Sequence, residues 1–302
     1  MSAEILCLGE PMVEFTRMAD GLYQRSIGGD TSNAAISAAR QGASVGYLTA
    51  LGADRFGEAI VDYWAAENVD AQHVHRHAVA PTGIYFIDPD PEERQFTYYR
   101  AGSAASLMQA GDLPVEAIRA AKCLHLSGIT LAVSDDLRET ANSAIQIAKK
   151  GGVPVSLDTN LRLKLWDAET ARAITHAAMA DVTIAVTSID DSLHLTGLEE
   201  PAAVAGFYHD LGPEIVLVTL GAEGCLLSVR GTATRIPPAP TTPIDSSGAG
   251  DSFSGAFLAW WLETGDPVLA ANRAAIVAAG TVAGLGAVDP IPLREEVLRK
   301  SS

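Results

Sequence analysis

The sequence predicts an α/β protein with a central, mostly parallel β-sheet, helices on both faces of that sheet and a small β-sheet lid. Short apolar runs alternate with helical stretches over much of the 302 residues, and this alternation is typical of parallel sheets covered by helices. Two glycine-rich segments each lead directly into a helical pattern. Residues 79–103 differ, because aromatic and β-branched runs there predict a hairpin outside the main sheet.

The central sheet is expected to begin near the amino terminus. Residues 5–8 form an apolar run that predicts a buried parallel strand, and residues 45–51 predict another. Further strands are expected at residues 123–126, 154–157, 182–186 and 215–219. Helices are expected after residue 33, at residues 58–67, 135–150 and 167–179, and after residue 251.

The lid is expected to come from two separate parts of the chain. Residues 11–28 lack a helical period and can form short strands, and residues 81–103 contain two β-rich runs around the turn D-P-D-P-E-E. No linker, repeat or low-complexity tract separates two units. We therefore expect residues 1–302 to form a single domain that carries a discontinuous lid.

The composition excludes several classes of protein. With 48% hydrophobic and 19% charged residues, the chain can bury a substantial core. Its formal net charge of −16 argues against nucleic acid or an anionic membrane as a partner. No apolar run approaches the roughly 20 residues that cross a bilayer. The start shows no basic signal segment, and Cys7, Cys123 and Cys225 lie in apolar runs, so we expect a cytoplasmic protein with reduced thiols.

The segment over residues 243–257 is the most informative motif. Gly248, Ala249 and Gly250 precede an apolar helix, so their backbone amides would lie at its positive end and form an anion site. Asp251 follows directly, and a lone aspartate there could simply cap the helix. A base beside amides that hold a phosphoryl group is, however, what phosphoryl transfer requires.

Polar side chains follow the expected strands at their carboxyl ends, where ligands of open α/β sheets bind. Asn160 and Arg162 lie just after one such strand. On the expected hairpin, period two places Tyr98 and Arg100 on one face, where they suit a sugar that bears a carboxylate. A capped polar loop and an ordinary aromatic sheet face are the alternative explanations for these residues.

The motifs of other nucleotide-binding classes are missing. The sequence contains no Gly-Lys dipeptide and therefore no P-loop, and it contains neither the catalytic loop of protein kinases nor their metal-binding tripeptide. Residues 52–57 do not spell the dinucleotide fingerprint, which argues against an oxidoreductase.

The two glycine-rich segments together resemble the signatures of the ribokinase-like (PfkB) family of carbohydrate kinases. Residues 28–33, G-G-D-T-S-N, are similar to its amino-terminal signature, and residues 245–251, D-S-S-G-A-G-D, are similar to its carboxyl-terminal one. The resemblance extends over essentially the whole chain and is greatest to the branch that phosphorylates 2-keto-3-deoxygluconate. The segments that carry this closer likeness are residues 82–85, 96–106, 125–129 and 158–162.

The resemblance implies a ribokinase-like fold and ATP-dependent phosphorylation of the terminal hydroxyl of the keto acid, with Mg²⁺ as cofactor. It implies Asp251 as general base and the amides of Gly248, Ala249 and Gly250 as anion hole. The residues that would hold the keto acid are Gly29, Asn33, Tyr85, Tyr98, Arg100, Arg162 and Asp251. Those that would border ATP are Asn160, Ser188, Thr219, Gly221, Gly224, Gly248, Gly250 and Asn272.

The chain departs from the family pattern near the expected metal. Many relatives carry an Asn-x-x-Glu motif that organises Mg²⁺, whereas residues 187–190 read T-S-I-D, so Asp190 would replace the glutamate with a shorter reach. Asp245 lies where related kinases bind a monovalent cation, which suggests K⁺. Glu10 stands where many sugar-kinase relatives have aspartate, and this bears on which hydroxyls are recognised.

Other functions share many of these features. A fructokinase or ribokinase-like activity would use the same catalytic residues and differ only in the lid. A catalytically silent, nucleotide-binding regulator would keep the fold without turnover. The expected partners are a small sugar acid and ATP, and an exposed edge of the lid sheet would permit a homo-oligomer through the lid.

Overall fold

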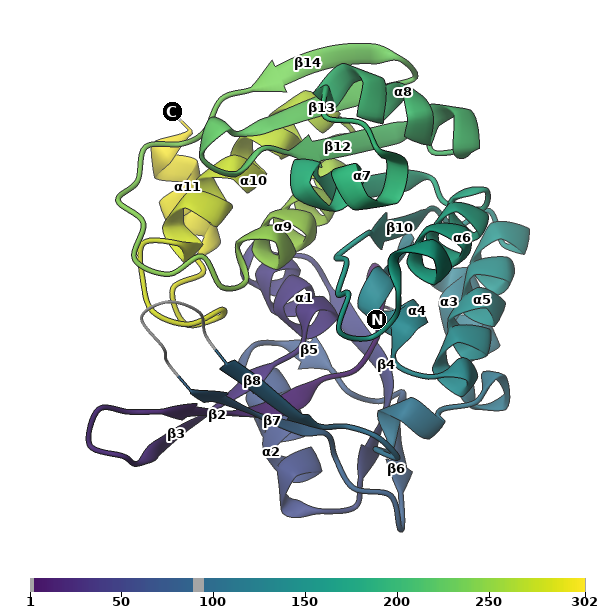
Figure 1. Cartoon of the computed structure of the whole chain (residues 1–302), viewed down its shortest axis with the longest axis vertical. Coiled ribbons are helices and arrows are strands. Elements are labelled where there is room, and N and C mark those ends of the chain that lie inside the picture. The colour runs from purple at the N-terminus through teal and green to yellow at the C-terminus, as the bar shows by residue number, and fades with distance from the viewer. Residues whose placement is uncertain (1–2, 89–94, 302) are drawn as a thin grey trace.

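The computed structural model describes residues 3–88 and 95–301, and its largest feature is a ten-stranded sheet (Figure 1). The strands of this sheet are β1 (Ile5–Leu8), β4 (Val45–Gly52), β5 (Val69–Asp70), β6 (Val74–His77), β9 (Cys123–Ser127), β10 (Val155–Asp158), β11 (Ile184–Ser188), β12 (Ile215–Thr219), β13 (Cys225–Val229) and β14 (Thr232–Ile236). They are ordered β14-β13-β12-β11-β10-β9-β1-β4-β5, and β6 also pairs with β4.

Most neighbours in this sheet are parallel, as the alternation of strands and helices predicts. The exception is one edge, where β13 pairs antiparallel with β12 and β14 pairs antiparallel with β13. The sequence did not predict β13 and β14 as strands, because the turn at residues 221–224, which precedes β13, suits either a ligand-binding loop or a hairpin.

Both faces of the sheet are buried, which the alternating side chains of β1 make plain. Ile5 and Cys7 belong to one apolar cluster, and Leu6 and Leu8 belong to the other. In Figure 1, the helices beside the first cluster lie mainly left of the sheet, and α3, α5 and α6 lie to its right. The helices are α1 (Asp30–Arg40), α2 (Arg55–Ala66), α3 (Val115–Ala120), α4 (Gly128–Ala132), α5 (Asp135–Lys150), α6 (Ala168–Met179), α7 (Ile189–Thr196), α8 (Pro201–Leu211), α9 (Ala249–Thr264), α10 (Pro267–Thr281) and α11 (Arg294–Lys300).

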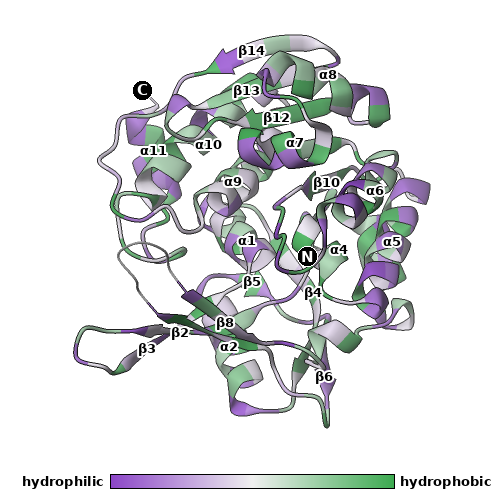
Figure 2. Ribbon diagram, viewed as in Figure 1, coloured by the Kyte–Doolittle hydropathy of each residue, from purple (hydrophilic) through white to green (hydrophobic). Residues whose placement is uncertain are grey.

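The helices divide into two sets, and each set packs against one face of the sheet. Helices α1, α2, α9, α10 and α11 supply residues to the first cluster, and α3, α4, α5, α6 and α8 supply residues to the second. Figure 2 shows hydrophilic residues along the outer side of α5, whose buried residues include Leu137, Ala141 and Ala148. Within the described ranges, no helix has the length and hydrophobicity that a membrane crossing requires. Cys7, Cys123 and Cys225 are buried and free, as expected.

The predicted small β-sheet is present and lies beside the carboxyl ends of the central strands. Its strands are β2 (Met12–Arg17), β3 (Tyr23–Gly28), β7 (Ile84–Asp88) and β8 (Gln95–Tyr99), ordered β3-β2-β7-β8. The sheet is mixed, because β2 and β7 run parallel while the outer pairs run antiparallel. Most of the turn predicted between β7 and β8 falls at residues 89–94, which lie outside the described residues.

Candidate active site

Two helices begin at the carboxyl edge of the central sheet, each after a glycine with a positive φ angle. Gly29 has φ 117° before α1, and Gly248 has φ 70° before α9. A Cβ atom on Gly29 would lie 2.7 Å from the carbonyl oxygen of Glu10, and one on Gly248 would lie 2.6 Å from that of Ala287. Glycine is therefore needed at both helix starts, for conformation as well as for space.

The first turns of these two helices meet at Asp251. The side-chain amide of Asn33 donates a 2.8 Å hydrogen bond to the Asp251 carboxylate, and Ser37 anchors α1 to the carbonyl oxygen of Ser252 at 2.7 Å. Burial raises the pKa of Asp251 to about 7, and the nearby negative charge of Asp30 adds to the rise. The Asn33 hydrogen bond and the positive charge of Arg162 oppose it.

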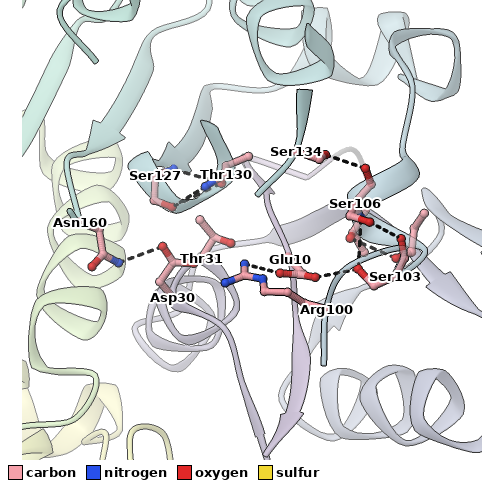
Figure 3. Close-up of polar contacts among 12 residues, drawn as sticks. Glu10, Asp30, Thr31, Arg100, Ser103, Ser106, Ser127, Thr130, Ser134 and Asn160 are labelled. Carbon is pink, nitrogen blue, oxygen red and sulfur yellow. Dashed lines mark hydrogen bonds and ion pairs between the residues drawn. The ribbon is translucent and has the colours of Figure 1, made fainter. Parts of the chain in front are cut away.

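Asp251 shares a small hollow with other acidic and polar side chains. The residues that line it are Asp30, Thr31, His125, Ser127, Asp158, Asn160 and Asp251. Asn160 points towards Asp30 and donates a 2.9 Å hydrogen bond to its carboxylate (Figure 3). Asp158 accepts a 2.9 Å hydrogen bond from Ser254, one turn beyond Asp251 on α9. The hollow thus joins α1, α9 and the ends of β9 and β10.

Two buried groups in the hollow have strongly shifted pKa values. Burial raises the pKa of Asp158 to about 8, with the negative charge of Asp251 as the next cause. Burial lowers the pKa of His125 to about 4, and its Nδ1 lies 3.1 Å from the hydroxyl oxygen of Ser156. At neutral pH, His125 is therefore an uncharged neighbour of the carboxylates.

Two tyrosines of the lid stack on each other. The hydroxyl of Tyr85 donates a hydrogen bond to the carboxylate of Glu14, and Tyr98 stacks on Tyr85 with ring centroids 5.5 Å apart. A Cβ atom on Gly28 would lie 2.1 Å from the Tyr85 hydroxyl oxygen. The glycine at the end of β3 therefore makes room for this tyrosine.

Arg100, which the sequence assigns to a substrate carboxylate, has a carboxylate partner inside the protein. Its guanidinium forms an ion pair with Glu10, whose other carboxylate oxygen accepts a 2.8 Å hydrogen bond from Ser103 (Figure 3). The Glu10 side chain is 0% exposed and that of Arg100 is 11% exposed. Burial raises the pKa of Glu10, and the charge of Arg100 opposes that rise. The pair ties the lead into β2 to the segment after β8.

Several residues predicted to border ATP lie at the carboxyl ends of central strands or just after them. Ser188 ends β11 and caps α7, because its hydroxyl accepts a 2.9 Å hydrogen bond from the Asp191 amide. Thr219 ends β12, and Gly221 and Gly224 follow it with φ angles of 56° and 90°. Asn272 lies on α10, where its side chain donates a 2.8 Å hydrogen bond to the Val268 carbonyl.

The residues predicted to lie near cations differ in their surroundings. Asp190 is exposed on the first turn of α7. Its neighbour Asp191 faces inwards and accepts 3.0 Å hydrogen bonds from the Thr159 hydroxyl and the Leu161 amide. Both oxygens of Asp245 accept hydrogen bonds, one from the amide and hydroxyl of Ser247 at 2.9 and 2.7 Å and the other from a backbone amide at 3.0 Å.

A family comparison agrees with this arrangement. The model of the pfkB family carbohydrate kinases matches residues 2–294. The chain belongs to this family. The predicted enzyme class, a carbohydrate kinase, is therefore confirmed, and so is the predicted family.

Individual relatives cover the PfkB kinase almost completely. This chain is 32% identical over 303 residues to a 2-dehydro-3-deoxygluconokinase of Thermoproteus tenax, and the alignment covers 97% of this chain and 92% of that protein. It is 34% identical over 304 residues to a 2-dehydro-3-deoxygluconokinase of Escherichia coli K12, covering 96% and 98%. A fructokinase of Klebsiella pneumoniae is 29% identical over 308 residues, covering 99% of each chain.

Solved structures confirm the ribokinase-like fold of this PfkB kinase. A PfkB protein from Polaromonas sp. JS666 superimposes with a TM-score of 0.89 at 29% identity and covers 98% of this chain and 99% of its own. A fructokinase from Xylella fastidiosa, solved with bound ATP, superimposes with a TM-score of 0.91 at 25% identity, covering 99% and 98%.

Two of the residues that meet in this site were predicted from the sequence, and two others were not. Asn33 and Asp251 were predicted, and the structure brings them together, although their roles in catalysis stay predictions. Asp30 and Asp158 were not predicted, yet both line the same hollow. The available signal was position, since Asp30 lies inside a glycine-rich segment and Asp158 ends a buried strand.

Proposed function

We propose that this PfkB kinase transfers the terminal phosphoryl group of ATP to the terminal hydroxyl of 2-keto-3-deoxygluconate. Two relatives at 32% and 34% identity are named for this substrate under its synonym, 2-dehydro-3-deoxygluconate. The observation that carries the proposal is the Asn33–Asp251 hydrogen bond beside the glycine-rich start of α9. It holds a carboxylate where helix amides can bind a phosphate.

Asp251 is the group we assign to proton transfer. Its carboxylate accepts the proton of the substrate hydroxyl, the freed oxygen forms a bond to the phosphorus atom, and ADP departs with the electrons of the broken P–O bond. A pKa raised to about 7 suits this role, because a base works best when its pKa lies near the operating pH. General base catalysis of this kind contributes roughly 10²- to 10⁴-fold in rate.

The start of α9 supplies the complementary charge. The amides of Gly248, Ala249 and Gly250 precede or open the helix, where the helix dipole favours negative phosphate oxygens. A Cβ atom on Gly250 would have open space around it. The backbone at this point is therefore accessible to a bound phosphate.

Magnesium fits this site as an ion carried by the nucleotide. Across residues 3–88 and 95–301, no group of three or more His, Cys, Asp or Glu side chains could hold a metal ion. Mg²⁺ commonly keeps several waters and binds substrate phosphates with one or two protein carboxylates, and Asp190 is the carboxylate that we assign to an indirect contact. The ion would offset negative charge on the phosphates, which this acidic chain cannot do.

The sugar acid would lie between the lid and Asp251. The guanidinium of Arg100 lies 5.6 Å from the centroid of the Tyr98 ring. Burial raises the pKa of Tyr98, and the positive charges of Arg100 and Arg162 oppose that rise. We assign the substrate carboxylate to this part of the site, with Tyr85 and Asn33 facing the hydroxyls. Gly29 lies at the start of α1, where a bound sugar can approach the backbone closely.

The Glu10–Arg100 pair favours a second candidate, a fructokinase activity. Because Arg100 already pairs with Glu10 inside the protein, it has less charge to offer a substrate carboxylate, and such a site suits a neutral sugar. Relatives named fructokinase at 29% identity support the same candidate.

An ADP-release assay with ATP and Mg²⁺ tests the proposal. It compares 2-keto-3-deoxygluconate, its galacto epimer, fructose, ribose and gluconate as acceptors, with Asp251→Asn as the control. We expect the highest kcat/KM with a keto acid. Preference for fructose would replace the proposed substrate but keep the kinase chemistry, and ATP binding without turnover on any acceptor would indicate a catalytically silent regulator.

A further inference from the structure

We propose that Asp30 is a positioning residue for proton transfer, because its carboxylate lines the same hollow as Asp251 and acts on that group through its charge. This inference rests on the proposed function, in which Asp251 accepts the proton of the acceptor hydroxyl. Asp30 belongs to neither the predicted substrate site nor the predicted nucleotide site. Its role would lie in the charge that it presents to Asp251.

The placement of Asp30 depends on two helices and one loop. Asp30 opens α1, and Asn33, three residues later on the same first turn, donates its 2.8 Å hydrogen bond to Asp251. Asn160, after β10, donates a 2.9 Å hydrogen bond to Asp30 and fixes its carboxylate (Figure 3). Asp30 and Asp251 line the same small hollow.

The charges around Asp251 come from several elements. Asp30 on α1 and Asp158 on β10 carry carboxyl groups in the same hollow, and His125 on β9 is kept neutral by burial. Arg162, in the loop after β10, is a positive group that opposes the rise in the Asp251 pKa. On the lid, burial is the main cause that raises the pKa of the Tyr85 phenol, and the charge of Asp251 adds a smaller contribution. Asp191 on α7 acts on Asp158 in the same direction.

Two carboxylates in a site with little water disfavour each other's ionised form. After burial, the charge of Asp30 is the largest cause that raises the pKa of Asp251 to about 7. Asn33 acts in the opposite direction, because its hydrogen bond stabilises the ionised carboxylate. The first turn of α1 therefore holds Asp251 in place with one residue and strengthens it as a base with another.

Two variants separate the charge of Asp30 from its contact. Asp30→Asn removes the charge but keeps the size and an oxygen that can accept from Asn160. Asn160→Ala removes the contact but keeps the charge, and because Asn160 is expected to border ATP, only the position of its acid limb and not its plateau is compared. The measurement is kcat/KM against pH for the wild type and both variants, with MgATP and the best acceptor from the substrate comparison. Titration of ATP itself is common to all three profiles and does not affect their differences.

We expect the acid limb of Asp30→Asn to move about one unit to lower pH, since a neighbouring charge typically shifts a pKa by one or more units. Its high-pH plateau should fall, because a weaker base transfers the proton less well. Asn160→Ala should keep the wild-type limb. An Asp30→Asn profile that only falls, with its limb unchanged, would show that Asp30 is merely structural. Equal shifts in both variants would assign the effect to the contact and overturn the proposal.

A titration without turnover separates this inference from the proposed function. The ¹³C carboxyl signal of Asp251, identified by its loss in Asp251→Asn, is followed against pH in the wild type and in Asp30→Asn. We expect a lower apparent pKa in Asp30→Asn even if no acceptor is phosphorylated. If the wild type phosphorylates an acceptor but the signal titrates identically in both proteins, the proposed function stands and the role of Asp30 is excluded.

Discussion

Asn33 donates a 2.8 Å hydrogen bond to Asp251 across 218 residues of sequence, and this bond joins the first turns of α1 and α9. Both residues come from the glycine-rich segments that carry the family resemblance. Each segment starts a helix, and the bond shows that the two starts form one site. The predictions below follow from this site and from the lid beside it.

Asp251→Asn should fold normally and bind ATP but lose turnover by roughly 10²- to 10⁴-fold, because the amide cannot accept the hydroxyl proton at neutral pH. The measurement is kcat in the ADP-release assay, together with ATP binding and thermal unfolding. Asp210→Asn, an exposed position on α8, is the matched control and should keep wild-type turnover. Near-normal kcat in Asp251→Asn would remove it as the base.

Asn33→Ala should move the acid limb of kcat/KM to higher pH. Its hydrogen bond lowers the pKa of Asp251, so removing it raises that pKa further above its ordinary value. Since the base is active only when deprotonated, activity is then lost at a higher pH on acidification. The same pH profiles that test Asp30→Asn measure this shift, and the two variants should move in opposite directions. A shift of Asn33→Ala to lower pH would contradict the assignment.

Arg100→Ala should raise KM for the keto acid far more than KM for ATP, since we place Arg100 near the substrate carboxylate. Equal effects on both would exclude that role. The variant should also unfold more easily, by roughly 3–5 kcal/mol, because Glu10 is left buried without its partner. Chemical denaturation measures this loss.

A matched pair of controls separates the two effects of Arg100. The double variant Glu10→Gln with Arg100→Ala should recover part of the stability, because no buried charge then lacks a partner. Arg17→Ala removes an exposed ion pair with Asp88 on the lid and should change stability by less than about 1 kcal/mol. A loss in Arg17→Ala as large as that in Arg100→Ala would mean that burial is not the cause.

Gly248→Ala and Gly250→Ala should differ, although both lie at the start of α9. Gly248 has a positive φ angle and no room for a Cβ atom, so Gly248→Ala should cost about 1–3 kcal/mol in stability. Gly250 has open space and an ordinary helical position, so Gly250→Ala should be stable but raise KM for ATP, because the methyl group would lie where we place a phosphate. Thermal unfolding and KM for ATP are compared for both. Unchanged KM in Gly250→Ala would argue against the anion hole.

Much of the fold could be predicted, because its pattern is local. The alternation of apolar strands and helices predicted the parallel sheet, and the β-rich runs predicted the lid strands. The antiparallel strands β13 and β14 were missed, since the glycine turn at residues 221–224 before β13 is compatible with several structures. Pairing of β2 with β7 depends on contacts between distant segments, which no local pattern records.

Candidate site residues could be proposed from the sequence where they belong to a recognisable motif. They could not be proposed where their role depends on side chains that only the fold brings close. Asp30 and Asp158 look like ordinary polar residues at a helix start and a strand end. Their importance depends on burial beside Asp251, which only the assembled sheet creates. Arg100 was assigned to a substrate carboxylate, but in the fold it forms an ion pair with Glu10, which lies between β1 and β2.

The central position of β1 has a consequence for synthesis of the chain. This strand lies between β4 and β9, so one of its edges has no partner until residues 123–127 have emerged from the ribosome. Ile5, Leu6, Cys7 and Leu8 are all buried in the finished sheet, and an unpaired apolar strand edge is a site of aggregation. We expect nascent chains that end before residue 123 to need a chaperone, and nascent chains that extend beyond β9 to need it less.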